Sequence, residues 1–323
     1  MNPPPAVEIA GLTHRYPDAD RPALDGLDLT VAAGQTFALL GPNGSGKSTA
    51  FRILATLLAP GGSGRVEVFG HCVRRHPGAV RRELGAVFQN PSLDVKLSAR
   101  ENLACHARLY GLSRRDARPR VDEALERFGL AQRQNQRVET FSGGMCRKLE
   151  IAKALLHQPR LLLMDEPATG LDPAARRELW DHLRQLNRSS GVTVVWTTHL
   201  MDEAEGADQL AVMSRGRLLA TSSPADLKAS LAGHVVVIEP LDDRDLPTIA
   251  QEIRSQMGKT PAVSDSAVRF EHNDGPAVVA RVAEMFPQRL RRISVGQPTL
   301  EDAYLRLTGH GQAGPAAPEA TAV

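Results

Sequence analysis

A glycine-rich stretch that ends in lysine and serine is the part of this sequence best suited to hold a phosphate group. Residues 41–49 read Gly-Pro-Asn-Gly-Ser-Gly-Lys-Ser-Thr and fit the pattern G-x-x-x-x-G-K-[ST], between an apolar run (37–40) and a helix-like run (50–58). The glycines let backbone N–H groups converge on an anion, and the start of a helix adds partial positive charge. Lys47 can reach the outer phosphates, and Ser48 can place its hydroxyl on Mg²⁺. The predicted nucleoside triphosphate site consists of Gly41, Pro42, Asn43, Gly44, Ser45, Gly46, Lys47, Ser48 and Thr49.

Two adjacent carboxylates supply the acidic element that such a site needs for its metal. Asp165 and Glu166 come directly after the apolar run 161–164, which has the length of a strand buried on both faces of a parallel sheet. Asp165 is placed to bind Mg²⁺ directly or through water. Glu166 is placed to accept a proton from an attacking water molecule.

A second pair of glycines opens another helix. Ser142 is a good N-cap residue, and Gly143 and Gly144 permit close approach of a phosphate to the end of a helix that runs over 146–156. Taken alone, this pattern indicates no more than a serine-capped helix.

The surrounding elements predict an α/β fold. Short strands are expected over 6–40, helices over 98–157, a helix over 173–188 and a buried strand over 192–198, so that strands and helices alternate. After residue 224 the pattern changes. We therefore predict a first domain over 1–231 with a helical subdomain at about 90–158, a small α+β domain over 232–309 that resembles ferredoxin-like domains, and a disordered tail over 310–323.

Composition narrows the class of protein. The chain has 323 residues, 42% hydrophobic and 24% charged, with a net charge of +2, which is typical of a globular protein and gives no electrostatic case for nucleic acid. Three cysteines suit a reducing compartment rather than a disulfide framework. The sequence shows neither an apolar run of membrane-spanning length nor a secretory signal, so we expect a location in the cytosol or on the cytosolic side of a membrane.

Taken together, these motifs resemble the ATP-binding cassette (ABC) ATPases over about residues 6–231. Phe141-Ser-Gly-Gly-Met145 is similar to the signature sequence of that family, which usually reads Leu-Ser-Gly-Gly-Gln. The methionine is similar to the drug- and lipid-exporting branch that includes the daunorubicin-resistance ATPases, whereas Cys146 departs from the arginine common there. The resemblance implies a P-loop NTPase (RecA-like) core, with an antiparallel β subdomain and a helical subdomain.

The resemblance also implies roles for four residues that local pattern alone leaves open. Tyr16 would stack on adenine, although a lone tyrosine in a strand indicates edge packing. Gln89, at the end of a strand over 84–89, would sense Mg²⁺ and the γ-phosphate, although by itself it reads as a surface amide. Asp172 lies in the loop that communicates across a dimer. His199 would contact the γ-phosphate, although alone it reads as a structural histidine at a strand end.

The implied activity is hydrolysis of ATP to ADP and phosphate. Glu166 would be the base, Lys47 and His199 would stabilise charge on the γ-phosphate, and Ser48, Gln89 and Asp165 would hold Mg²⁺. Because one core cannot present both phosphate-binding ends to one ATP, the resemblance implies a head-to-tail dimer with a second copy of the chain. Each ATP would lie between Gly41–Thr49 of one subunit and Ser142–Gly144 of the other.

The implied biological role is to energise an exporter from the cytoplasmic face of the cell membrane. A separate integral membrane permease would form the path and would contact about residues 90–110; drug, lipid, polysaccharide and peptide all remain possible cargo. The main alternative is a soluble ABC ATPase that acts on nucleic acid or ribosomes. Such proteins typically carry a coiled-coil insertion, zinc-binding cysteine pairs or two cassettes, and none is visible here. A nucleotide-regulated binding module without turnover is disfavoured because Glu166 is intact.

Overall fold

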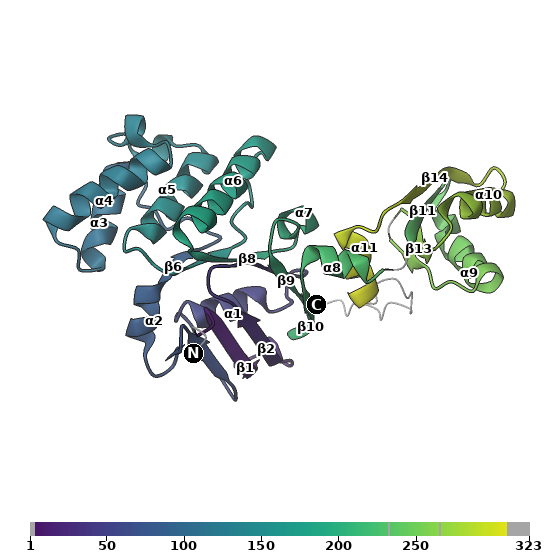
Figure 1. The fold of residues 1–323 in the computed structure, drawn as a ribbon, viewed down its shortest axis with the longest axis horizontal. Coiled ribbons are helices and arrows are strands. Elements are labelled where there is room, and N and C mark those ends of the chain that lie inside the picture. The colour runs from purple at the N-terminus through teal and green to yellow at the C-terminus, as the bar shows by residue number, and fades with distance from the viewer. Residues whose placement is uncertain (1–3, 232, 265, 309–323) are drawn as a thin grey trace, which may run out of the picture. The chain divides into compact units, whose positions relative to one another are not determined.

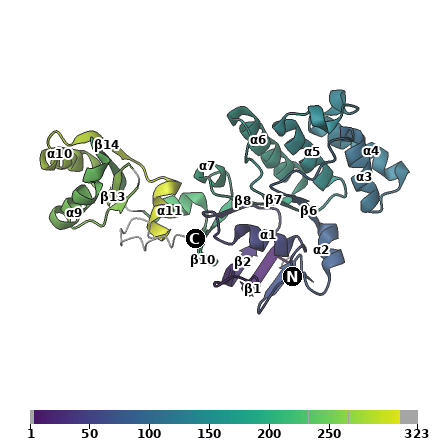
Figure 2. The same cartoon turned by 180° about the vertical axis from the view of Figure 1, so that it is seen from behind.

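The computed structural model describes residues 4–231, 233–264 and 266–308. The chain divides into two compact units, Met1–Thr221 and Ser222–Val323. Figure 1 shows a larger α/β unit and a smaller α+β unit, and Figure 2 shows the same units from behind. The predicted disordered tail over 310–323 lies outside the described residues. Within the described part of the chain, no helix has both the length and the apolar character needed to cross a bilayer.

A six-stranded sheet forms the centre of the first unit. Its strand order is β10-β9-β3-β8-β7-β6, and the pairs β3–β8, β8–β7, β7–β6 and β3–β9 are parallel. All residues of β3, β7 and β8 are buried, as expected for strands covered on both faces. The strands are β3 (Thr36–Leu40), β6 (Leu84–Val87), β7 (Leu161–Asp165), β8 (Thr193–Thr198), β9 (Gln209–Ser214) and β10 (Arg217–Ser222).

A smaller antiparallel sheet packs beside this core. Its order is β2-β1-β4-β5, formed by β1 (Val7–His14), β2 (Leu24–Val31), β4 (Arg65–Val68) and β5 (His71–Cys72). Helix α1 (Lys47–Leu54) lies between the two sheets, where Phe51 and Leu54 share one hydrophobic core with residues of both. The fold therefore confirms the predicted α/β core with an antiparallel β subdomain.

Helices account for most of the segment between β6 and β7. They are α3 (Ala99–Leu109), α4 (Arg114–Arg127) and α5 (Gly143–Leu155), with short 3₁₀ turns at Ala131–Arg133 and Val138–Thr140. Helix α3 begins with a capping box in which Ser98 and Glu101 satisfy each other's backbone N–H groups. The remaining helices of this unit are α2 (Pro77–Glu83), α6 (Pro173–Ser190) and α7 (Met201–Ala204).

The second unit contains a four-stranded antiparallel sheet in the order β12-β13-β11-β14. Its elements are α8 (Pro224–Ala229), β11 (His234–Pro240), a 3₁₀ turn (Asp243–Asp245), α9 (Leu246–Met257), β12 (Ala262–Val263), β13 (Val268–His272), α10 (Gly275–Met285), β14 (Leu290–Gly296) and α11 (Leu300–Thr308). From β11 to β14 the order is β-α-β-β-α-β, the order of ferredoxin-like units. Side chains of α9 and α10, such as Ile249 and Val282, form a separate core with Val236 and Ile238 of β11.

The structure differs from the expected element bounds in several places. Helix α1 begins at Lys47 and ends at Leu54 rather than spanning 50–58, because Gly46 at φ 101° starts it and Thr56 at φ 60° follows its end. Strand β6 stops at Val87, so Gln89 follows the strand rather than closing it. The division of the chain falls after Thr221 rather than after residue 231, because α8 contacts α11.

Candidate active site

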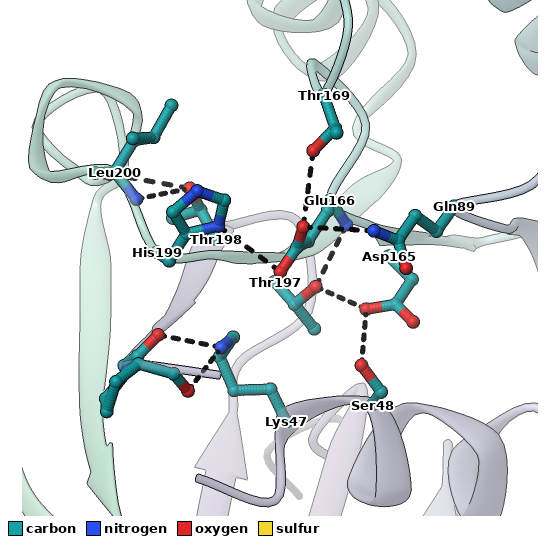
Figure 3. Close-up of polar contacts among 12 residues, drawn as sticks. Lys47, Ser48, Gln89, Asp165, Glu166, Thr169, Thr197, Thr198, His199 and Leu200 are labelled. Atoms are coloured by element: carbon teal, nitrogen blue, oxygen red, sulfur yellow. Dashed lines mark hydrogen bonds and ion pairs between the residues drawn. The ribbon is translucent and has the colours of Figure 1, made fainter. Parts of the chain in front are cut away.

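The predicted chemical groups meet at the carboxyl edge of the parallel sheet. The glycine-rich loop follows β3, Asp165 ends β7, and His199 comes directly after β8. Gln89 reaches the same edge from the segment after β6, and Figure 3 shows these side chains around one small space. In open α/β sheets this edge is where ligands bind. The structure therefore brings together Lys47, Ser48, Gln89, Asp165, Glu166 and His199, which are far apart in the sequence.

The glycine-rich loop has the backbone geometry of a phosphate cradle. Glycine is required at two positions of the loop because any side chain there would clash with the backbone. A Cβ atom on Gly46 would lie 2.4 Å from the carbonyl oxygen of Ala23, and one on Gly41 would lie 2.4 Å from the carbonyl oxygen of Met213. No side chain caps the first turn of α1, so its N–H groups are available to an anion. The Ser45 hydroxyl is buried and has no hydrogen-bond partner among the described residues. These donors fit the oxygens of a phosphate chain.

Lys47 is a buried cation at the base of this loop. Its Nζ donates hydrogen bonds to the carbonyl oxygens of Gly41, at 2.7 Å, and Pro42, at 3.0 Å. Burial lowers the pKa of Lys47, while the nearby carboxylates of Glu166 and Asp165 act in the opposite direction. The side chain thus lies between the loop and the acidic pair, where it can stabilise negative charge on a bound phosphate.

A hydroxyl and a carboxylate form the part of the site that suits Mg²⁺. Ser48 Oγ lies 3.2 Å from Asp165 Oδ1. The described residues contain no group of three His, Cys, Asp or Glu side chains that could hold a metal ion. Mg²⁺ keeps several waters and binds through one or two carboxylates together with substrate phosphates. Ser48 and Asp165 therefore fit a metal whose other ligands are phosphate oxygens and water.

Glu166 is held in place from several sides. Its Oε2 accepts hydrogen bonds from Thr169 Oγ1 at 3.2 Å and from Gln89 Nε2 at 3.4 Å, and its Oε1 lies 3.3 Å from His199 Nδ1. Its backbone has φ 45°, in the left-handed region that glutamate rarely adopts. Strained backbone of this kind is found at active sites, where the surrounding structure enforces it.

Thr197 links the two carboxylates, and the sequence analysis did not identify it. Its Oγ1 accepts a hydrogen bond from the N–H of Glu166 at 2.9 Å and donates to Asp165 Oδ1 at 2.5 Å (Figure 3). The side chain is 0% exposed. The one available signal was a threonine in a buried strand, where its hydroxyl needs a partner, and Thr193 and Thr198 of the same strand carry the same signal. Thr169, in the turn that follows Glu166, was also missed.

The backbone on either side of His199 is also fixed. Thr198 Oγ1 donates to Glu203 Oε2 at 2.7 Å and accepts from the N–H of Leu200 at 3.0 Å. Burial raises the pKa of Glu203. His199 itself is half-exposed, with its ring beside Glu166. The loop that carries the histidine is therefore anchored while the ring remains accessible to a ligand.

Tyr16 lies beside the glycine-rich loop, two residues beyond the end of β1. Its hydroxyl is 3.3 Å from Thr49 Oγ1, and its ring packs edge-on against His14 at 4.9 Å between centroids. This position next to α1 is compatible with the predicted contact to a base.

The signature sequence lies elsewhere in the first unit. Ser142 caps α5 by accepting a hydrogen bond from the N–H of Met145 at 3.3 Å. A Cβ atom on Gly144 would lie 3.2 Å from Ala175 of α6, which Asp172 caps through the N–H groups of Ala174 and Ala175. In the described part of the chain, no hydrogen bond or ion pair joins 142–144 to 41–49.

Comparisons with known proteins agree with this geometry. Residues 24–169 match the family described as ABC transporter. The chain is 41% identical to the daunorubicin/doxorubicin resistance ATP-binding protein DrrA of Streptomyces peucetius, over 96% of this chain and 95% of that protein. It is 37% identical to the Nod factor export ATP-binding protein I of Rhizobium meliloti (strain 1021), over 95% and 89% of the two chains.

Solved structures give the same result. The structure of cbiO1 from Clostridium perfringens, part of the ABC transporter complex cbiONQ, matches with a TM-score of 0.65 and 26% identity, over 79% of this chain and 96% of that one. An ATP-binding cassette solved as a dimer in a post-hydrolysis state with ADP and Pi matches with a TM-score of 0.61 and 27% identity, over 67% and 98% of the two chains.

Proposed function

This chain belongs to the ABC transporter family of ATP-binding proteins, and from that premise we propose that it is the ATP-hydrolysing subunit of a membrane exporter. The observation that carries the proposal is that four side chains meet at one edge of the sheet: Lys47, Ser48, Asp165 and Glu166. The Ser48 hydroxyl lies 3.2 Å from the Asp165 carboxylate. The comparisons give no support to a nucleic-acid or ribosomal role.

We assign each group a role that its position supports. The γ-phosphate binds at the glycine-rich loop, where Lys47 and His199 stabilise its charge. Glu166 orients the attacking water and accepts its proton, because its carboxylate is anchored yet adjacent to the phosphate cradle. Ser48, Asp165 and Gln89 would hold Mg²⁺, which would supply positive charge to the phosphate oxygens.

We further propose that two copies of the chain bind two ATP molecules in a head-to-tail dimer. The separation of the Ser142–Gly144 half-site from the Gly41–Thr49 half-site supports this arrangement, and a similar cassette is a dimer in its solved structure. ATP then forms part of the interface, and its hydrolysis weakens the dimer. The free energy of ATP binding is thus used to associate the two subunits.

Glu166→Gln tests the enzymatic assignment. The amide keeps the shape of the side chain but cannot accept the proton, so turnover should fall by roughly 10²- to 10⁴-fold while ATP affinity is retained. Steady-state phosphate release and a binding titration measure the two quantities, and Glu126→Gln, an exposed carboxylate on α4, is the matched control. Near-normal turnover in Glu166→Gln would remove this residue from the role of base.

The same variant tests the dimer. Because it binds ATP without hydrolysing it, Glu166→Gln should elute as a dimer from size-exclusion chromatography in ATP and Mg²⁺, and as a monomer without nucleotide. An elution volume independent of ATP would contradict the proposed interface.

We propose that a separate integral membrane subunit forms the cargo path and that this chain binds it from the cytoplasmic face of the membrane. A structural relative that is part of an ABC transporter complex supports this proposal. Affinity purification of the tagged chain from detergent-solubilised membranes of its host should recover a stoichiometric polytopic protein. Recovery with ribosomes or nucleic acid, and without a membrane protein, would overturn the exporter assignment but not the ATPase assignment.

A further inference from the structure

Three charged side chains on α5 are buried and point to one partner segment. Arg147, Glu150 and Lys153 are 6%, 1% and 9% exposed. They are spaced three residues apart and therefore lie along one face of the helix. Burying a charge is costly unless the group is paired and hydrogen-bonded. Their partners identify what this arrangement holds.

The partner segment is 88–92, which follows β6 and contains Gln89. Arg147 donates to the carbonyl oxygens of Phe88, at 2.7 Å, and Gln89, at 3.3 Å. Glu150 Oε1 accepts from the N–H of Ser92 at 2.7 Å, and its other oxygen pairs with Arg147 at 3.0 Å. Lys153 donates to the carbonyl oxygen of Ser92 at 2.8 Å and to its hydroxyl at 2.6 Å.

These contacts tie the backbone of 88–92 to α5 at three points. The side chain of Gln89 is then free to extend the other way, toward Glu166 (Figure 3). The amide nitrogen of Gln89 is 3.4 Å from Glu166 Oε2, longer than the ~2.7–3.2 Å of a good N–H···O hydrogen bond. A displacement of a few tenths of an ångström in the segment therefore strengthens or breaks this contact.

Helix α5 begins at the half-site that faces the other subunit in the proposed dimer. Its first turn is capped by Ser142, and the buried charged face starts one turn later at Arg147. Because a helix moves as a rigid element, a shift of its first turn would reach 88–92 through the three side chains. The contact between Gln89 and Glu166 lies at the end of this path.

We propose that Arg147, Glu150 and Lys153 are positioning residues that set Gln89 against Glu166 according to the position of the signature helix. This inference rests on the proposed ATPase function and deepens it, because ATP bound against one chain's Ser142–Gly144 adjusts the catalytic base of that same chain. The two ATP sites of the dimer are thereby coupled through α5.

The test is a double-mutant cycle in the full-length chain. Arg147→Met keeps the aliphatic stem of the side chain and removes the bonds to Phe88 and Gln89. It should lower kcat by roughly 10- to 100-fold, the scale expected for a misplaced catalytic contact, while the Kd for ATP changes by less than about threefold. If the effect passes through Gln89, the Arg147→Met/Gln89→Ala double variant should be no slower than Gln89→Ala alone.

Two further variants serve as a control and as a second test of the proposal. Lys148→Met changes a basic residue on the same helix that pairs with Glu178 rather than with 88–92, and it should leave kcat unchanged. Lys153→Met is a milder disruption of the same network, to be used if Arg147→Met does not fold, and it should show the same non-additivity with Gln89→Ala.

Additive losses in the double variant, or an unchanged kcat in Lys153→Met and Arg147→Met, would overturn the positioning role. Such a result is distinguishable from failure of the ATPase assignment. If only the positioning role fails, Glu166→Gln still loses turnover. If the ATPase assignment fails, Glu166→Gln keeps near-normal turnover.

Discussion

The carboxylate of Glu166 and its backbone are held by different neighbours. Thr169, Gln89 and His199 contact the carboxylate, whereas Thr197 accepts the backbone hydrogen bond. Because the same Thr197 hydroxyl donates to Asp165, one side chain sets the spacing of the proposed metal ligand and the proposed base. The two carboxylates are therefore positioned as a unit.

Thr197→Val removes this link with little change of shape. The N–H of Glu166 loses its partner, so the free energy of unfolding should fall by about 1–3 kcal/mol. Turnover should fall roughly tenfold, because both carboxylates lose their common anchor. Chemical denaturation and phosphate release measure the two effects.

Thr193→Val is the matched control on the same strand. Its hydroxyl accepts from the N–H of Gly34 at 2.8 Å, at the opposite end of β8 from the site. We expect a similar loss of stability with turnover unchanged. Equal losses of turnover in the two variants would show that Thr197 acts only through stability.

Residues that follow a buried strand were predictable from the sequence. Lys47 and Asp165 follow apolar runs of strand length, and the carboxyl ends of the strands of a parallel sheet share one edge. The role of His199 came only from the family resemblance. Thr197 was not predictable, because its hydrogen-bond partners lie 31 and 32 residues away and carry no local signal. Arg147, Glu150 and Lys153 were missed for the same reason, since their partners are 58 to 61 residues distant.

At the scale of helices, two histidines lie where α3 meets the end of α5. The ring of His157 stacks on Tyr110 of the C-cap of α3 at 3.9 Å, and His106 lies beside both. His106 Nε2 and His157 Nδ1 are buried without a hydrogen-bond partner among the described residues. Burial lowers the pKa of each histidine from 6.5 to about 4. Protonation of either ring is therefore disfavoured in the folded chain.

This contact predicts loss of stability in acid. A histidine whose pKa is lowered by folding binds fewer protons in the native state than in the unfolded state. The free energy of unfolding is therefore unaffected by this histidine above pH 6.5 and decreases as the pH falls from 6.5 toward 4. By pH 5 the loss should be on the order of 1 kcal/mol per histidine, after allowance for partial exposure to solvent.

Thermal unfolding between pH 7.5 and 4.5 checks the prediction. The His106→Gln/His157→Gln variant should have a flatter acid dependence of Tm than the unaltered chain. A parallel dependence in both proteins would locate the acid-sensitive groups elsewhere.

Long, strongly patterned elements were foreseen more readily than short ones. Helix α6 was expected over 173–188, and the structure has Pro173–Ser190. Helix α2 has seven residues and β12 has two, so neither carries enough of a period to be recognised. The sequence analysis assigned Asp172 only to a loop, through the family resemblance, and the structure shows that its side chain also caps α6.

At the scale of the whole chain, the two units have separate hydrophobic cores. One includes Phe37, Phe51 and Leu161, and the other includes Val236, Ile249 and Phe286. Every residue assigned to nucleotide chemistry lies in the first unit. Separate cores are the property that allows domains to fold alone.

A fragment ending at Ser222, the last residue of β10, should therefore bind ATP within about threefold of the affinity of the full chain. Circular dichroism would establish that the fragment is folded, and a fluorescent nucleotide titration would measure its affinity. A folded fragment without affinity would assign part of the nucleotide site to the C-terminal unit.

The left-handed backbone of Glu166 has a consequence for directed evolution. Such a conformation costs on the order of 1–3 kcal/mol in a residue other than glycine, and this glutamate also adds a second buried carboxylate beside Asp165. Glycine and asparagine relieve both penalties, since they accept φ 45° without charge. A library selected for heat resistance alone should thus enrich Glu166→Gly and Glu166→Asn, and the survivors would bind ATP without consuming it. Thermotolerance and catalysis compete for the same position in this chain.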